Sequence, residues 1–375
     1  MNPRPRIVHV YKDVHPPVEG GIERIIERLA ILSSERYEVR VIVASRQGRG
    51  GQRQIGDGVP VTEIRSWGRW LSTPVAPGFI SELRRGDADL YHFHVPHPTG
   101  ELAYLLSGSR TPAVATYHSD VVRQCRAMLL YGPLFRRFLA RMRVIMPTSR
   151  RYMESSEQLA PHRSRCRVVP LGYPLEAYEL TEAIRARAAQ LREAHGEFVL
   201  FLGCLRSYKG LHFLFEAMAD LPATRLVIAG DGPTGPELRR LADQRSMADR
   251  VMLPGWVDQD EAIALLHAAS VFVLPSHQRS EAFGLCQIEA MACGLPVIST
   301  DLPTGVPEVN VHEETGLIVP PTDPAALREA ISTLLADPDR RRQMGQAGRR
   351  RAREHYRDAE MARRVMEIYD QVLGA

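Results

Sequence analysis

The sequence predicts an α/β protein made of two doubly wound domains, each with a parallel sheet covered by helices. Three observations predict this fold class. The chain has 375 residues, which is more than one hydrophobic core usually supports. Short β-branched runs alternate with amphipathic segments, and this order is typical of βαβ units. The alternation pauses near residues 172–180 and then starts again, which indicates two similar halves.

The first half begins with a strand at 6–10 and a helix at 20–34. Apolar side chains recur along this helix at the spacing of one buried face: Ile22, Ile25, Ile26, Leu29 and Leu32. The glycine-rich segment 47–58 is predicted to be a loop or the tip of a hairpin. Further strands are predicted at 38–45, 90–95, 113–118 and 144–149.

The second half repeats the strand–helix order after a charged helix at 180–195. The predicted strands are 197–203, 224–229, 250–257, 270–276 and 295–301. The predicted helices between them are 211–221, 237–246, 261–269 and 283–293. The last segment, 340–373, has the pattern of one long helix that is basic at its start.

The composition is that of an ordinary globular protein, with 44% hydrophobic and 25% charged residues. No apolar run is long enough to cross a bilayer, and the first residues lack the apolar core of a signal peptide. The five cysteines show neither CxxC nor Cys/His ligand spacing. We therefore expect a cytoplasmic protein with reduced cysteines.

The net charge of +4 is unevenly distributed. Residues 1–172 contain 26 Lys and Arg against 15 Asp and Glu, whereas the remainder contains 22 against 29. A basic first half suits phospholipid head groups at the inner face of a membrane or a diphosphate-linked acceptor. The alternative is that its arginines occupy solvated helix faces. No zinc-finger, KH or RRM motif favours nucleic acid.

A second observation bears on membrane contact. Segment 129–143 combines apolar side chains with four arginines, a pattern shared by interfacial helices and by ordinary helices that pack on their own domain.

The most informative segment is 276–296. It places Glu281 just before the predicted helix and Glu289 two turns inside it, eight residues later. Eight helical residues rise about 12 Å, so the two carboxylates suit the two ends of one elongated ligand. The N–H groups of Phe283, Gly284 and Leu285 at the helix start favour a phosphate.

Two further segments carry features of a phosphate site. The strand at 197–203 ends in Gly203, and Arg206 and Lys209 follow before the next helix. Two cations in this position suit a diphosphate, and ligands of such sheets bind at the carboxyl ends of strands. Gly20 and Gly21 open the first helix but lack the full GxGxxG spacing, so they are a weak fingerprint.

Taken together, these motifs resemble the GT4 family of retaining glycosyltransferases, which have the GT-B fold of two Rossmann-like domains that face a central cleft. The resemblance rests on the Gly-Gly loop, the pair Arg206 and Lys209, the GDGP of 230–233 and the SEAFGLCQIEAMACGLPVI of 280–298. Glu281 and Glu289 match the E-x7-E motif of that family. The resemblance spans nearly the whole chain.

The resemblance implies a role for each matched residue. Glu281 would bind hydroxyls of the donor sugar, Glu289 the ribose hydroxyls, and Arg206 and Lys209 the departing diphosphate. Backbone amides complete the donor site, and the residues that supply them are Gly20, Gly21, Phe283, Gly284 and Leu285. The remaining matches are Gly203 and Gly232 in the donor-binding loops, Val257 beside the base, and His118 near the donor sugar.

The resemblance also implies domain roles and substrates. An acceptor domain at 1–175, joined by a helix at 356–375, would accompany a donor domain at 176–355. The donor would be a nucleotide sugar, first GDP-mannose and next a UDP-hexose, and the acceptor a glycan or a lipid-linked sugar. The sequence looks most like bacterial mannosyl- and rhamnosyltransferases of O-antigen and exopolysaccharide assembly. Transfer would proceed by front-face attack without a metal ion or other cofactor.

Several residues suggest metal sites on first inspection. Asp87 and Asp89 form a DxD triplet, but it precedes the strand at 90–95 and so lies at the sheet edge opposite the ligand. Strand alternation places His92 and His94 on one face, yet no carboxylate follows at ligand spacing. We expect no metal site, and we place His94 and His97 as candidate residues of the acceptor cleft.

Two rival functions remain, and a third, a dehydrogenase, is disfavoured. A GT-B nucleotide-sugar epimerase would use the same donor site without an acceptor. A non-catalytic nucleotide-sugar-binding protein would not need the complete set of charged motif residues. A dehydrogenase would need a GxGxxG motif with an acidic residue downstream, which this sequence lacks.

Overall fold

The computed structural model describes residues 3–70, 73–120 and 125–374, with the backbone alone at 125–130. The chain divides into two compact units. Unit 1 contains the chain up to Gly172 and the segment from Asp358 onward, and unit 2 contains Tyr173–Arg357. These limits lie within a few residues of the predicted ones.

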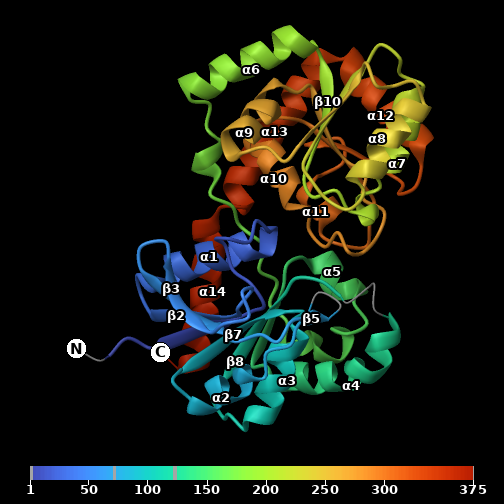
Figure 1. The fold of residues 1–375 in the computed structure, drawn as a ribbon. Helices are drawn as coiled ribbons and strands as arrows, with labels where there is room; N and C mark the ends of the chain where they lie inside the picture. The colour runs from blue at the N-terminus through green and yellow to red at the C-terminus, as the bar shows by residue number, and fades with distance from the viewer. Residues whose placement is uncertain (1–2, 71–72, 121–124, 375) are drawn as a thin grey trace. The chain divides into compact units, whose positions relative to one another are not determined.

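Unit 1 is built around a seven-stranded sheet of order β3-β4-β2-β1-β7-β8-β9 (Figure 1). All neighbours are parallel except β3 and β4. The strands are β1 Arg6–Val10, β2 Glu38–Ala44, β3 Gly51–Ile55, β4 Val59–Ile64, β7 Leu90–Val95, β8 Ala113–Tyr117 and β9 Val144–Pro147. A separate two-stranded ribbon consists of β5 Arg69–Trp70 and β6 Thr73–Pro74.

Helices cover both faces of this sheet. They are α1 Gly21–Ser34, α2 Gly78–Arg85, α3 Pro98–Ser107, α4 Cys125–Arg141, α5 Arg150–Ser155, the 3-10 helix η1 Ala160–Arg165 and α14 Asp358–Leu373. Phe93 packs against Phe138 of α4, whereas its neighbour His92 contacts Tyr369 of α14. Because successive strand residues face opposite sides, α4 and α14 lie on opposite faces of the sheet.

Unit 1 differs from the sequence prediction in the segment after β2 and in α1. Strand β4, Val59–Ile64, was not predicted. Segment 47–58 is not merely a loop, because Gly51–Ile55 forms the edge strand β3. In α1, Ile22 and Leu32 are only half-buried, while Glu23 and Ser33 are buried. Ser33 tolerates burial because its hydroxyl donates to the carbonyl of Leu29 at 2.6 Å.

The apolar side of α4 is buried within unit 1. Phe135, Phe138 and Leu139 are at most 2% exposed, while Arg136 and Arg137 are exposed. This arrangement agrees with the prediction of an ordinary packed helix over that of an interfacial one. No helix in the described part of the chain combines the length and the apolar character that a membrane span requires.

Unit 2 contains a six-stranded, parallel sheet of order β12-β11-β10-β13-β14-β15. Its strands are β10 Phe198–Leu202, β11 Arg225–Ala229, β12 Val251–Gly255, β13 Val271–Leu274, β14 Val297–Thr300 and β15 Gly316–Val319. Its α-helices are α6 Glu182–His195, α7 Leu211–Ala219, α8 Gly235–Gln244, α9 Gln259–Ala268, α10 Leu285–Ala292, α11 Val306–Val309, α12 Pro324–Ala336 and α13 Pro338–His355. Two 3-10 helices are η2 Leu175–Tyr178 and η3 Ser207–Lys209.

The predicted long helix at 340–373 is wrong, because it is two helices, α13 and α14, that separate at Tyr356. The Tyr356 carbonyl accepts the N–H of Tyr173 at 2.8 Å, and its hydroxyl donates to the Glu308 carbonyl at 3.0 Å. These bonds hold Tyr356 in unit 2, while α14 belongs to unit 1. There, Arg28 pairs with Asp358 at the start of α14 at 2.7 Å.

Candidate active site

The site in unit 2 lies where the strand order of its sheet changes direction. The chain runs from β10 outward to β11 and β12, then returns to place β13 on the other side of β10. The segments that follow β10 and β13 therefore leave the sheet side by side at its carboxyl edge. Such a switch point is where doubly wound sheets bind ligands.

At this point a lysine from one segment meets a glutamate from the other. Lys209 follows β10, Glu281 follows β13, and their Nζ and Oε2 atoms are 2.5 Å apart. The Ser276 hydroxyl donates to the same Oε2 atom at 2.9 Å. Lys209 and Glu281 are 8% and 7% exposed. This buried ion pair and its serine were not predicted, since the resemblance implied a diphosphate as the partner of Lys209 and a sugar as the partner of Glu281.

The charges of Lys209 and Glu281 neutralise each other. Burial alone would lower the pKa of Lys209, but the adjacent charge of Glu281 outweighs burial and raises that pKa above its ordinary value. The ammonium therefore stays charged, and the pair carries no net charge. In the structure as it stands, Lys209 neutralises a carboxylate instead of offering a free charge to a phosphate.

The turn before α7 packs tightly against the segment that follows β13. Gly210 has a φ of +69°, and a Cβ atom there would lie 2.1 Å from the Pro275 carbonyl oxygen. The N–H of His277 also donates to the Tyr208 carbonyl at 3.0 Å. Only glycine fits a position that combines left-handed backbone with so close an approach. Gly210 is thus a further structural requirement of the site that sequence reasoning missed.

Helix α10 begins at Leu285, two residues later than predicted. Gly284 precedes it with a φ of 77°, and a Cβ atom there would lie 2.6 Å from the Gln287 amide nitrogen and 2.8 Å from Leu274. Phe283 is 5% exposed, and Leu285 is half-buried. The first N–H groups of a helix have no intrahelical partner and attract anions, so this end of α10 retains the character predicted for it.

The later helix start changes the relation between the two glutamates. Glu289 is the fifth residue of α10, about one turn inside it instead of two. Residues 281–284 are not helical, so the predicted 12 Å rise along one helix does not apply. Because each glutamate has different partners, the two carboxylates still belong to separate parts of the site.

Glu289 is held by a tyrosine from the start of unit 2. The Tyr178 hydroxyl, in η2, donates to Oε1 of Glu289 at 2.9 Å. Burial, and next the charge of Glu289, raise the pKa of Tyr178 far above its ordinary value. The hydroxyl thus remains a donor. No sequence signal singles out Tyr178, because it lies in a short turn more than a hundred residues from Glu289.

The remaining predicted donor residues lie around the same sheet edge. Arg206 is exposed, and no side chain among the described residues pairs with its guanidinium. Gly203 and Gly232 belong to adjoining loops, since the Leu205 N–H between Gly203 and Arg206 donates to the Asp231 carbonyl at 2.9 Å. Val257 follows β12 and is half-buried. The roles of these residues stay predictions.

In unit 1, Gly20 is the N-cap of α1, and Gly21 is its first residue. A Cβ atom on Gly20 would lie 2.0 Å from Oε2 of Glu23. Burial raises the pKa of Glu23, and a carboxylate here disfavours a phosphate unless it is protonated or moves away. The predicted phosphate contact at this helix start is therefore opposed by Glu23.

The predicted histidine, His118, directly follows β8 and is 3% exposed. It is not isolated, because its Nε2 atom lies 3.2 Å from Nδ1 of His94, whose Nε2 lies 3.0 Å from Nδ1 of His9. His92 and His94 share one face, as alternation predicted, and their ring centroids are 4.3 Å apart. His94 and His97 are fully buried, so the prediction that they line an acceptor cleft is wrong for the structure as it stands.

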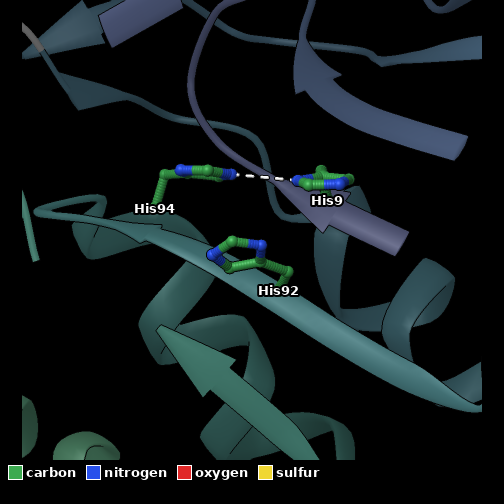
Figure 2. Close-up of side chains that lie close together, drawn as sticks. All are labelled: His9, His92 and His94. Carbon is green, nitrogen blue, oxygen red and sulfur yellow. Dashed lines mark hydrogen bonds between the residues drawn. The ribbon is translucent and has the colours of Figure 1, made fainter. Parts of the chain in front are cut away.

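The nitrogen atoms of His9, His92 and His94 lie within 4.8 Å of one another (Figure 2). However, both nitrogens of His92 are already engaged, Nδ1 with the Tyr369 hydroxyl at 2.6 Å and Nε2 with the Thr116 hydroxyl at 2.8 Å. These two hydrogen bonds account for the burial of His92 without a metal ion. Asp89, of the DxD triplet, accepts the Arg6 N–H at 2.8 Å. This bond joins the starts of β7 and β1.

These histidines predict a loss of stability in acid. Burial lowers the pKa of His9, His97 and His118 to about 3, so the unfolded chain binds protons below pH 6.5 that the folded chain does not. Stability present above pH 6.5 is therefore lost as the pH falls toward 3, by about 1.4 kcal/mol per pH unit for each ring. Thermal unfolding at about pH 7 and about pH 5 should show a clear drop in melting temperature.

One buried carboxyl acts in the opposite sense. Burial raises the pKa of Glu101 to about 8, so its contribution is present at low pH and is lost as the pH rises from its ordinary value toward 8. Between about pH 5 and about pH 7, Glu101 therefore offsets the pH dependence of stability that one histidine contributes. As a control, His97→Phe should show a shallower pH slope than the wild type, and equal melting temperatures at both pH values would contradict the prediction.

A surface cavity of about 640 Å³ lies elsewhere in unit 2. Its lining includes Arg192, His267, Cys293 and Arg341, and none of the predicted site residues contributes to it. Several of its polar groups are already used, for example the Arg192 guanidinium, which donates to the Ala268 carbonyl at 3.1 Å. The switch point therefore remains the candidate site. The four described cysteines, Cys166, Cys204, Cys286 and Cys293, are free thiols.

Comparison with known proteins identifies the family of the chain. Residues 19–177 match the family described as Glycosyltransferase Family 4, and residues 183–351 match Glycosyl transferases group 1. The D-rhamnosyltransferase WbpZ of Pseudomonas aeruginosa is 35% identical over 93% of this chain and 91% of its own. The O-antigen chain mannosyltransferase C of Escherichia coli is 32% identical over 98% of this chain and 99% of its own.

A solved structure gives the fold. HepE of Anabaena in complex with UDP-glucose superposes with a TM-score of 0.79 at 18% identity, and the match covers 98% of this chain and 100% of HepE. The fold is accordingly GT-B, with two Rossmann-like domains. With the family matches in both halves and relatives that align over nearly the full length, the chain is a glycosyltransferase that belongs to family 4.

Proposed function

We propose that this enzyme transfers a hexose from a nucleotide sugar to a glycan or lipid-linked acceptor, with retention of configuration, in the assembly of a cell-surface polysaccharide such as O-antigen. Our first choice of donor is GDP-mannose. The observation that carries the proposal is the Lys209–Glu281 pair beside the start of α10, at the switch point of the sheet. The two full-length relatives support the polysaccharide context.

The proposed chemistry follows from where charge develops. As the anomeric C–O bond breaks, the sugar gains oxocarbenium character and the nucleoside diphosphate gains negative charge. The exposed Arg206 and the N–H groups at the start of α10 stabilise that charge most in the transition state, which lowers the barrier. Lys209 contributes when the arriving substrate draws its ammonium away from Glu281, and the released carboxylate accepts sugar hydroxyls.

The acceptor hydroxyl then forms the new glycosidic bond on the face from which the diphosphate departs. Its proton passes to an oxygen of the leaving phosphate, so no protein nucleophile, metal ion or other cofactor takes part. His118 contacts the donor sugar in this proposal. A UDP-hexose is the second candidate donor, because the structure of HepE with the same fold contains UDP-glucose.

Thermal-shift measurements with GDP, UDP and ADP test the donor first. A nucleotide at a hundred times its Kd should stabilise the folded protein by about 2.7 kcal/mol. We expect GDP to give the largest shift, and a shift with UDP alone would replace GDP-mannose by a UDP-hexose.

A turnover assay then tests the reaction. GDP-mannose should be consumed quickly only when a lipid-linked O-antigen oligosaccharide is present, and equally well in EDTA. The anomeric configuration of the product is then read by NMR. Fast consumption without acceptor would indicate an epimerase or hydrolase, and a strict Mn²⁺ requirement would contradict the metal-free mechanism.

A further inference from the structure

Three buried histidines of unit 1 form a continuous hydrogen-bonded chain. His9 of β1, His94 of β7 and His118 after β8 come from three adjacent strands. They share one face of the sheet, because His9 pairs with His92 in register and His94 pairs with Thr116. The two N···N distances, 3.0 and 3.2 Å, fall within hydrogen-bond range.

The rings lie end to end instead of face to face. Their planes differ by only 17° for His9 and His94 and by 21° for His94 and His118, with centroids 5.3 and 5.4 Å apart. An imidazole N–H and the lone pair of the other nitrogen both lie in the ring plane, so this near-coplanar arrangement suits N–H···N bonds. Figure 2 shows His9 and His94 in this relation, with His92 lying apart from their line.

This geometry couples the tautomers of the three rings. A neutral imidazole has one N–H donor and one acceptor nitrogen, and each N···N contact requires one proton. Only two arrangements satisfy both contacts. Either all three rings carry their proton on Nδ1, or all three carry it on Nε2. Burial lowers the pKa of each ring far below neutrality, so the neutral forms are the relevant ones.

The two terminal rings of this histidine chain, His118 and His9, differ in how deeply they are buried. Among the described residues, neither Nδ1 of His118 nor Nε2 of His9 has a partner. His118 is 3% exposed, whereas His9 and His94 are fully buried. His118 is therefore the end that lies nearest the surface, with its Nδ1 atom itself buried. Each arrangement leaves one N–H without a partner: on Nδ1 of His118 in the first, and on Nε2 of the fully buried His9 in the second. An unpaired N–H costs more the more deeply it is buried, which favours the proton on Nδ1 in all three rings.

We propose that His9, His94 and His118 form a tautomer relay in which His94 and His9 are positioning residues that hold the proton of His118 on Nδ1, ready to donate to an oxygen of the sugar substrate. The inference rests on the proposed function only for the identity of that substrate. The bond that a histidine makes through one nitrogen decides which nitrogen carries the proton, and here that control extends over two rings.

Long-range ¹H–¹⁵N correlation NMR of the full chain labelled at histidine reads the tautomers directly, without reference to activity. We expect His9, His94 and His118 to share the Nδ1–H form and to keep equal tautomer populations when GDP-mannose is added. In His94→Phe, which keeps a ring but removes both nitrogens, the tautomer populations of His118 should differ from those in the wild type and should no longer equal those of His9. Different tautomers in the wild-type rings, or an unchanged His118 in His94→Phe, would overturn the relay.

Kinetics separate positioning from packing. His94→Phe should lower kcat about tenfold, as removal of an orienting partner typically does, with the KM for GDP-mannose within about threefold. His94→Gln should recover part of the rate, because its amide both donates and accepts. The matched control is His92→Phe, a buried residue of the same strand and face outside the chain. It should lower the melting temperature and leave kcat and the His118 tautomer unchanged, and an equal loss of kcat in this control would contradict the proposal.

If neither GDP-mannose nor UDP-glucose is turned over by the wild type, the proposed function fails. The NMR comparison between wild type and His94→Phe in the ligand-free enzyme still decides whether the relay exists.

Discussion

Substitution of either Lys209 or Glu281 by alanine should reduce glycosyl transfer at least tenfold, which corresponds to about 1.4 kcal/mol of transition-state stabilisation. The reason is that the two side chains meet at 2.5 Å at the switch point, where we propose that charge develops on the leaving diphosphate. Each single variant also leaves one buried charge without its partner, which typically costs about 3–5 kcal/mol of folding stability. Initial rates and denaturant unfolding measure the two effects separately.

The double variant Lys209→Met/Glu281→Gln is the control for stability. It replaces both charges by neutral side chains of similar volume, so it should recover much of the folding stability without recovering activity. Substitution of a buried ion pair by uncharged groups is often neutral for stability. If the double variant folds and transfers sugar at the wild-type rate, the assignment of this pair to catalysis is wrong.

Glu289→Ala should weaken donor binding about tenfold, or about 1.4 kcal/mol. The Tyr178 hydroxyl donates to Oε1 of this carboxylate, so in the proposed complex Oε2 accepts the ribose hydroxyls. Charge-assisted hydrogen bonds of this kind contribute about 1.5–3 kcal/mol each. Calorimetric titration with GDP-mannose measures the change, and unaltered affinity would remove Glu289 from the donor site.

Tyr178→Phe is the matched comparison for Glu289→Ala. It keeps the carboxylate and the aromatic ring but removes the hydroxyl that orients Oε1. We expect a smaller loss of affinity, about threefold, because the contact to the donor remains while its geometry loosens. A loss as large as that of Glu289→Ala would mean that the tyrosine hydroxyl itself binds the ligand.

The prediction succeeded where the sequence signal is local. Apolar runs such as 198–202 located the central strands of both sheets, because a strand covered on both faces is apolar throughout. The edge strand β3, its neighbour β4 and the edge strand β15 were not predicted. Local signals also placed Arg206 and Lys209 after β10, and Glu281 ahead of α10. Element ends were less secure. Nothing in the sequence indicates that Gly284 adopts left-handed backbone and so delays the helix to Leu285.

The helical pattern at 340–373 was misread for a related reason. Both α13 and α14 have good helical sequences, and the break at Tyr356 arises because its backbone and hydroxyl bond to Tyr173 and Glu308. These partners are distant in the sequence. Helical periodicity alone does not reveal a chain that leaves one unit and joins another.

By itself, the sequence determined the central strands and most of the helices, the two-domain organisation and the motifs that identify a family 4 glycosyltransferase. The tertiary structure alone decided which of those motifs touch. Lys209 meets Glu281 because β13 returns to pair with β10 past β11 and β12, and three separate strands align His9, His94 and His118. Periodicity reports which face of an element is buried, but contacts between elements depend on strand order and register, which are properties of the folded sheet.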